Sequence, residues 1–202
     1  MHSFTTESAR IDYPPPMSAP VFIYVAPARY EDILKLGFSH DPADRVRSFH
    51  ARWFEYFDLE RGFVLQATDE KDARRIELRL AGEFAEHRTQ APLVVERAVG
   101  GFTEWYRGAY PALRASAERL VATEGYCALE PLASRLHDKL IAEREQLFER
   151  TTAMLDAIDA LGADPLAVGL RRSLRDALDA YAALGVEVDE WLPEDVRAWR
   201  TQ

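Results

Sequence analysis

The apolar pattern of this chain changes character near residue 110, and this change constrains the fold more than any other feature. Before that point, short β-branched and apolar runs alternate with segments of helical spacing. After it, the apolar spacing is helical throughout, with proline near the helix starts and glycine after two of the helix ends. The sequence therefore predicts an α/β domain over residues 21–110 followed by an all-helical region over residues 111–202.

The first half has the pattern of a small α/β sandwich. Residues 21–26 and 33–39 predict a β-hairpin, residues 63–67 a third strand, and residues 93–99 a further edge strand. Asp41 and Pro42 predict the start of a helix that runs to about Phe57. Thr68 or Asp69 caps a second helix, whose apolar residues recur at helical spacing up to Phe84.

The second half predicts helices over residues 111–123, 131–161, 165–184 and 193–200. Along the longest of them, apolar residues recur every seven positions from Leu140 to Leu161 and form one broad stripe. The following helix offers a matching stripe, so an antiparallel helical hairpin is expected. Its outer face packs either on the first domain or on a second subunit, and homo-oligomerisation through these helices remains an open alternative.

Net charge argues against indiscriminate binding to nucleic acid, because such binding depends mostly on Lys and Arg. The chain of 202 residues has a formal net charge of −9. Residues 1–110 hold 14 Lys and Arg against 17 Asp and Glu, whereas residues 111–202 hold 11 against 17. The first half is therefore the better candidate for contact with nucleic acid, through a local basic surface made by Arg45, Arg47, Arg52, Arg74, Arg75 and Arg79.

The single cysteine, Cys127, excludes an internal disulfide and favours a reducing, cytoplasmic compartment. No stretch of eighteen consecutive apolar residues is present, so no membrane partner is expected. Residues 1–20 contain three consecutive prolines with Ser and Thr, which is typical of a flexible tail.

Several different residues of the first domain lie at long, specific intervals along the sequence. They are Tyr24 in Phe22-Ile23-Tyr24, Lys35 in Lys35-Leu36-Gly37, Arg45, Glu77, and the segment Thr103-Glu104-Trp105-Tyr106. Together they resemble the GIY-YIG nuclease superfamily, and in particular its T5orf172 or phage-derived branch, in which a lysine often replaces the second tyrosine. The resemblance covers residues 20–110 and implies a three-stranded sheet with flanking helices.

The resemblance also implies roles for these residues in hydrolysis of a nucleic-acid phosphodiester, with DNA favoured over RNA. Glu77 would hold one Mg²⁺ or Mn²⁺ ion, which suits a single carboxylate with several waters. Arg45 would bind phosphate oxygens, Tyr24 would help to activate water, and Lys35 would contact phosphate or lower the pKa of Tyr24. Each residue also has a plain structural interpretation: a solvated helix glutamate, a first-turn ion pair, a packed strand tyrosine and an edge lysine.

Three further residues are candidates for supporting roles. Glu104 belongs to the closing Glu-Trp-aromatic motif, and Arg47 belongs to the local basic surface. Phe49 stands where the family commonly has His or Tyr, so His50, one residue later, is the substitute candidate if the helix register differs. This departure keeps a second function open, namely a catalytically inactive module of the same fold that binds nucleic acid or protein and carries a helical interaction domain.

Overall fold

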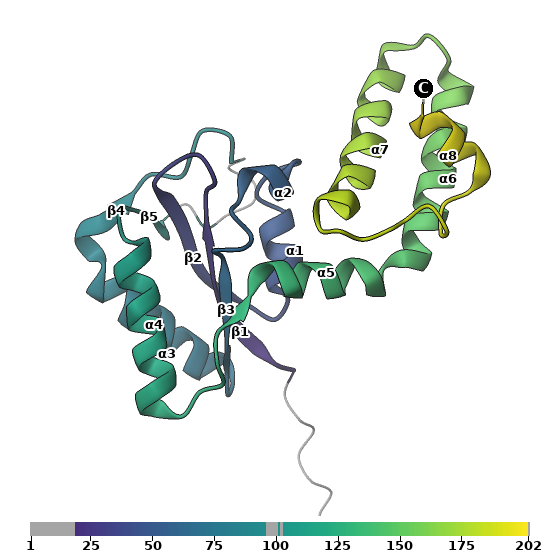
Figure 1. Cartoon of the computed structure of the whole chain (residues 1–202). Helices are drawn as coiled ribbons and strands as arrows, with labels where there is room; N and C mark the ends of the chain where they lie inside the picture. The colour runs from purple at the N-terminus through teal and green to yellow at the C-terminus, as the bar shows by residue number, and fades with distance from the viewer. Residues whose placement is uncertain (1–18, 96–100, 102, 202) are drawn as a thin grey trace, which may run out of the picture.

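The structure, a computed structural model, describes residues 19–95, 101 and 103–201. Within these residues the chain forms one six-stranded sheet and eight α-helices (Figure 1). The strands lie in the order β4-β5-β2-β1-β3-β6, and all pairs are antiparallel. Their bounds are β1 Val21–Pro27, β2 Ile33–Ser39, β3 Phe63–Ala67, β4 Arg88–Thr89, β5 Trp105–Arg107 and β6 Glu130–Pro131.

The central strand β1 is buried along its whole length because helices cover both faces of the sheet. Alternate residues of β1 point to opposite faces, as the two-residue period of a strand requires. Phe22, Tyr24 and Ala26 join the core under α1 (Pro42–Arg47), α2 (Trp53–Tyr56) and α5 (Leu132–Ala142). The opposite face packs against α3 (Glu70–Glu83) and α4 (Tyr110–Glu124).

The α/β class is confirmed, but the sheet has six strands and not the predicted three. The additional strands β4, β5 and β6 are only two or three residues long, so they have no alternation that a sequence pattern could reveal. Helix α4 begins at Tyr110, so all but its first residue lie beyond residue 110, as does β6. The core of the sheet therefore includes residues of the region predicted to be a separate helical domain.

The helix predicted from residue 42 to about residue 57 is interrupted. Its first segment, α1, ends at Arg47, and α2 begins only at Trp53. Two side chains stabilise the break: Ser48 Oγ donates to the Arg45 carbonyl at 2.7 Å, and the backbone N–H of Arg52 donates to His50 Nδ1 at 3.1 Å. Such local side-chain bonds to the backbone compete with the helical ladder.

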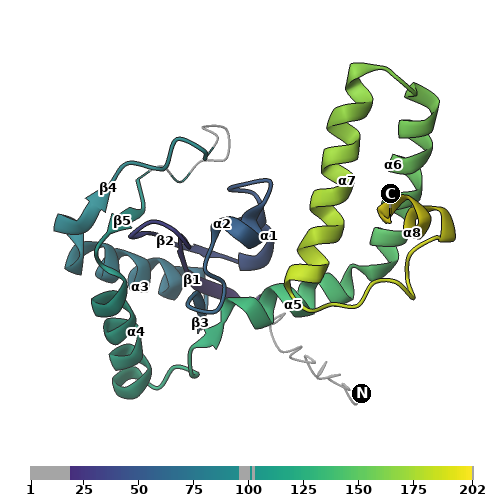
Figure 2. The same cartoon turned by 45° about the horizontal axis from the view of Figure 1, so that its top comes forward.

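The long helix predicted over residues 131–161 is also two helices, α5 and α6 (Arg144–Leu161). The chain changes direction at Glu143, as Figure 2 shows. The N–H of Glu143 is shared between the carbonyls of Lys139 and Leu140, while its carboxylate accepts from Arg47 at 2.8 Å and pairs with Lys139 at 3.3 Å. The apolar stripe continues through the bend, which is why periodicity alone suggested one helix.

The helical hairpin is present as predicted. Helices α6 and α7 (Pro165–Ala183) lie side by side, and α8 (Glu194–Arg200) packs against them (Figures 1 and 2). Ion pairs connect this hairpin to the sheet part: Arg52 bonds with Asp176 and with Asp179 of α7, the latter at 3.1 Å. Lys139 of α5 donates to Asp41 at 2.7 Å.

Two sequence predictions fall partly or wholly outside the described residues. The tail predicted over residues 1–20 is described only from residue 19, and the strand predicted over 93–99 is described only to Val95. Residues 93–95 form a turn and a bend there, not a strand. Among the helices that the structure describes, none combines the length and apolar character needed to cross a membrane.

Candidate functional site

Tyr24 lies at the middle of the sheet, opposite Gly37 of β2 and Val64 of β3. Its side chain is 1% exposed, and its ring lies over the backbone of Gly37. A Cβ atom placed on Gly37 would lie 2.6 Å from the Tyr24 hydroxyl oxygen and 2.8 Å from the ring carbon that bears it. The glycine therefore makes the space that the tyrosine ring occupies.

We expect Gly37→Ala to destabilise the protein by about 1–3 kcal/mol, because the new methyl group overlaps a buried ring that has little room to move. Urea unfolding followed by circular dichroism measures the change. Gly82→Ala, in the last turn of α3, is the matched control: its Cβ would meet nothing within 4 Å. That control should be neutral or stabilising. Equal stability of the two variants would contradict the close contact between Gly37 and Tyr24.

Lys35 is the only buried lysine of the described residues, with 1% exposure. Its ammonium donates to Glu104 Oε2 at 2.8 Å and to the carbonyl of Leu36 at 3.0 Å. The rings of Phe49 and Trp105 lie 5.8 and 6.0 Å away, so aromatic faces surround the charge. Burial lowers the pKa of Lys35, and the hydrogen bond with Glu104 opposes this effect.

Arg45, on α1, reaches the same place from the helix side. Its guanidinium lies 4.6 Å from the centre of the Phe49 ring. Both cations lie against Gly101, in the segment before β5. A Cβ atom placed on Gly101 would lie 2.9 Å from Arg45 Nη2 and 3.2 Å from Lys35 Nζ, so the glycine leaves the space that these side chains occupy. The positive φ of Gly101, 73°, also favours glycine.

The Tyr24 hydroxyl faces this group of charges. Burial raises the pKa of Tyr24 well above its usual value, while the charge of Arg45 and hydrogen bonding with it act in the opposite direction. The negative charges of Glu77 and Glu104 raise the pKa further. The hydroxyl therefore stays protonated at neutral pH, and it can donate a hydrogen bond but does not serve as a ready base.

Glu77 approaches from α3 and is half-buried. Burial raises the pKa of Glu77, and repulsion by Glu104 raises it further, against the attraction of Lys35 and Arg74. Within the residues that the structure describes, the carboxylate of Glu77 makes no hydrogen bond or ion pair. The carboxylate of Glu77 is therefore held near that of Glu104 and has no hydrogen-bond or ion-pair partner among the described residues.

The structure brings five of the candidate residues into one cluster. The charges of Arg45, Glu77 and Glu104 all act on both Tyr24 and Lys35. These residues come from four different elements and from the segment before β5. We refer to Tyr24, Lys35, Arg45, Glu77 and Glu104 as the charged cluster.

His50 and Arg47 lie elsewhere, so the expectation that they support the site is not met. The His50 ring stacks on Tyr56 at 5.1 Å, and its Nδ1 accepts the N–H bond that stabilises the break before α2. Arg47 points toward α5 and α6, where it bonds with Glu143. The His50 prediction depended on the register of a helix running to about Phe57, whereas the helix ends at Arg47 and His50 lies in the break before α2.

Among the described residues there is no group of three or more His, Cys, Asp or Glu side chains able to hold a metal ion. The carboxylates of the charged cluster are those of Glu77 and Glu104. Burial raises the pKa of Glu77, and repulsion by Glu104 raises it further. A metal ion at Glu77 would therefore have one or two carboxylate ligands and would keep most of its water, a binding mode that Mg²⁺ accepts.

Gly101 and Phe49 contact the charged cluster but have no predicted role in it. The signal for Gly101 was its place in a glycine pair shortly before the Thr103-Glu104-Trp105-Tyr106 segment. Phe49 departs from the family pattern, and its ring lies against both Lys35 and Arg45.

Comparison of the chain with protein-family models, with curated proteins and with solved structures found no match. The class that the fold defines is an antiparallel α/β sandwich with a helical hairpin attached to it. Its function must be argued from the charged cluster itself.

Proposed function

We propose that this chain is a GIY-YIG-like nuclease that hydrolyses phosphodiester bonds of nucleic acid, DNA in preference to RNA, with a divalent metal ion. One observation carries the proposal: Arg45 and Lys35 both lie against Gly101 and Phe49, and the charges of Arg45 and Glu77 act on both Tyr24 and Lys35. A random set of strand and helix residues would scatter over the fold. Convergence of cations, a hydroxyl and a carboxylate is what phosphoryl chemistry requires.

Each residue has a role that its surroundings support. The guanidinium of Arg45 offers a planar pair of donors to the non-bridging phosphate oxygens. The Tyr24 hydroxyl, protonated at neutral pH, orients a water molecule or donates to a phosphate oxygen. Lys35 contributes positive charge from a fixed position, because Glu104 and the Leu36 carbonyl hold its ammonium.

Glu77, with Glu104 beside it, would hold the divalent ion. When bound, Mg²⁺ or Mn²⁺ supplies positive charge that neutralises the developing charge on phosphate. The chain's own contribution is to keep Glu77 half-buried on the rigid helix α3 and free of other ion pairs within the described residues.

One observation favours the second function, a catalytically inactive binding module. The ammonium of Lys35 is occupied by a 2.8 Å ion pair with Glu104, which reduces its capacity to attract phosphate. Phe49, in the position where the family commonly has His or Tyr, offers no proton-transfer group. A module of this kind would keep the cluster for stability and bind its partner elsewhere.

Cleavage of supercoiled plasmid, single-stranded DNA and RNA by the purified protein separates the two functions. The nuclease is expected to cut in the presence of Mg²⁺ or Mn²⁺, to stop in EDTA, and to favour DNA. Arg45→Lys keeps the charge but loses the planar fork, so slower cutting is expected from this variant. A folded wild-type protein that cuts none of these substrates with either metal would favour the binding module.

A further inference from the structure

The face of α7 that is turned toward Arg52 carries an unusual concentration of positive charge. Arg171, Arg172 and Arg175 line a groove of this helix together with Val168 and with Arg52 from the sheet part. The region from residue 111 onward is strongly acidic overall, with 11 Lys and Arg against 17 Asp and Glu. The groove is thus a local reversal of the prevailing charge. We call Arg171, Arg172 and Arg175 the α7 arginines.

Within the described residues none of the α7 arginines forms an ion pair with a carboxylate, in contrast to Arg52, Arg79 and Arg119. Arg171 donates to the carbonyl of Gly162 at 3.1 Å, and the guanidinium of Arg175 lies 5.4 Å from the Trp199 ring. Both contacts hold the side chains while leaving the positive charge unneutralised. Arg172 is exposed.

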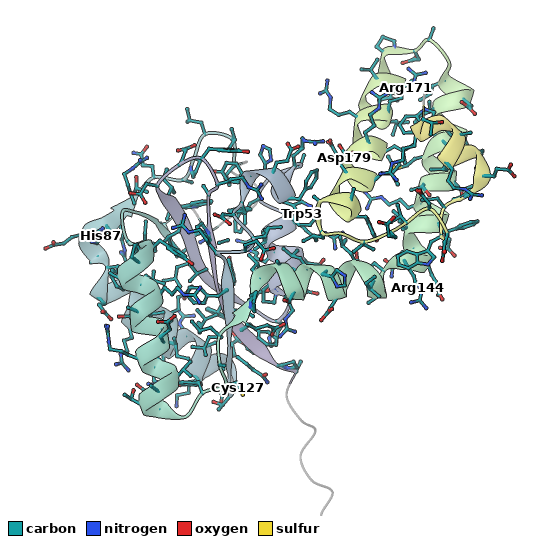
Figure 3. All side chains as sticks on the ribbon, in the orientation of Figure 1. Trp53, His87, Cys127, Arg144, Arg171 and Asp179 are labelled. Atoms are coloured by element: carbon teal, nitrogen blue, oxygen red, sulfur yellow. The ribbon has the colours of Figure 1, made fainter. Side chains whose placement is uncertain are left out.

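Two aspartates in the same groove do not cancel this charge. Asp176 and Asp179 both bond with the guanidinium of Arg52. Arg52, which also pairs with Glu55, joins α7 to the sheet part, and the groove keeps a positive balance because four arginines and two aspartates line it. In Figure 3, Asp179 lies toward the end of α7 that is next to Trp53, and Arg171 lies toward the other end.

The groove runs along α7 and is also lined by Arg52 of the sheet part. From Arg171 to Arg175 the helix rises about 6 Å, at 1.5 Å per residue, so the three arginines lie within about one helical turn. Arg52 comes after α1 in the sequence, and α1 carries Arg45 of the charged cluster. A strand lying in this groove would contact both halves of the chain.

We infer that the α7 arginines form a phosphate-backbone contact surface for nucleic acid, so that the helical hairpin, and not only the sheet part, binds the substrate. This inference rests on the proposed function for the identity of the partner. Arginine forks match the oxygens of a phosphate group, and a contact of this kind is independent of base sequence. It also gives a chain with net charge −9 a specific place to hold a polyanion.

Fluorescence anisotropy with a labelled 20-base-pair DNA duplex, in EDTA to prevent cleavage, measures the contact. The test variant combines Arg171→Gln, Arg172→Gln and Arg175→Gln. If all three side chains contact phosphates, we expect affinity to fall roughly tenfold or more, and the slope of log K against log salt to become shallower by about 2.7. The control combines Arg114→Gln, Arg119→Gln and Arg200→Gln, which removes the same charge from arginines that each pair with a carboxylate and lie outside the basic surface predicted from the sequence.

The control variant should bind within about twofold of the wild type, since its arginines are already neutralised. Arg175 contacts Trp199, so a third variant with lysine at all three α7 positions guards against loss of packing: it should fold and retain most of the affinity. Equal loss in the test and control variants, or wild-type binding by the test variant, overturns the inference. So does absence of DNA binding by the wild type, or equally strong binding of poly-glutamate, which would indicate an acidic protein partner.

The outcome is separable from that of the proposed function because binding is measured without cleavage. DNA binding that depends on the α7 arginines in a protein that never cuts would leave this inference standing and remove the nuclease. Metal-dependent cutting by a protein whose DNA affinity does not depend on the α7 arginines would remove this inference and leave the nuclease proposal standing.

Discussion

Glu77→Gln is expected to reduce metal-dependent cleavage roughly 100-fold or more while leaving the fold intact. The amide keeps the size of the carboxylate but removes the negative charge that would hold the cation, and a metal ion supplies several kcal/mol of charge stabilisation. Initial rates of plasmid nicking across a Mg²⁺ titration measure the loss. A higher metal requirement with an unchanged maximal rate would mean that Glu77 only aids metal binding.

The same variant should not lose stability, and this distinguishes a functional carboxylate from a structural one. The pKa of Glu77 is raised in the folded protein, so its ionised form disfavours folding. For the wild type, the stability contributed by this group is present below the unfolded pKa near 4.5 and is lost as the pH rises through the folded pKa. Glu77→Gln removes this pH-dependent loss of stability, so at pH 7 the variant should be as stable as the wild type or more stable.

Glu70→Gln, on the exposed start of the same helix, is the matched control for both measurements. It changes the same chemical group on α3 but lies outside the charged cluster, so cutting should continue at the wild-type rate. If Glu77→Gln cuts as well as Glu70→Gln, the assignment of Glu77 to the metal is wrong. If Glu77→Gln is strongly destabilised, the carboxylate is a structural group after all.

Glu104→Ala is expected to destabilise the protein by about 3 kcal/mol or more. It leaves the ammonium of Lys35 buried without its 2.8 Å partner, and loss of one member of a buried ion pair typically costs about 3–5 kcal/mol. The carboxylate itself is 34% exposed, which favours the lower end of that range. Urea unfolding at pH 7 gives the free energy directly.

The loss should shrink as the pH rises. Burial already lowers the pKa of Lys35 below its ordinary value of 10.5, and without Glu104 the pKa falls further. Between the lowered folded pKa and 10.5 the unfolded chain binds more protons than the folded one, so stability rises with pH in that window. The variant enters the window at a lower pH than the wild type, and its deficit at pH 9 should be smaller than at pH 7.

The double variant Lys35→Met, Glu104→Ala tests the same explanation from the other side. It removes the buried charge together with its partner, so it should recover part of the stability that Glu104→Ala loses. If the single and double variants are equally unstable, the loss comes from packing around β5 and not from an uncompensated ammonium.

Local patterns were sufficient to predict most of the secondary structure. The hairpin of β1 and β2, strand β3, helix α3 and helix α7 follow from alternation, apolar spacing, and capping or helix-start residues. Of the two caps considered for α3, the structure has Asp69. The two interrupted helices were missed because apolar spacing continues through both breaks. What ends each helix is a side-chain contact, at Ser48 and His50 in one case and at Glu143 in the other.

The resemblance to a family led us to expect four candidate residues in one place, but not the pairing between them. The charges of Arg45 and Glu77 act on both Tyr24 and Lys35, and the role of these residues as a functional site stays a prediction. The ion pair between Lys35 and Glu104 joins residues 69 positions apart, and no local pattern encodes such a contact. It depends on β5 pairing with β2, which places the residue before Trp105 beside Lys35.

The bend at Glu143 means that the direction of the helical hairpin is set by electrostatics, whereas its internal structure is set by apolar packing. The bend residue is held by Arg47 and Lys139, and Arg52 holds the far side of the hairpin through Asp176 and Asp179. Partly exposed ion pairs weaken as ionic strength rises, but buried leucines do not respond in that way. Salt should therefore change the angle between the two halves of the molecule before it changes the helix content of either.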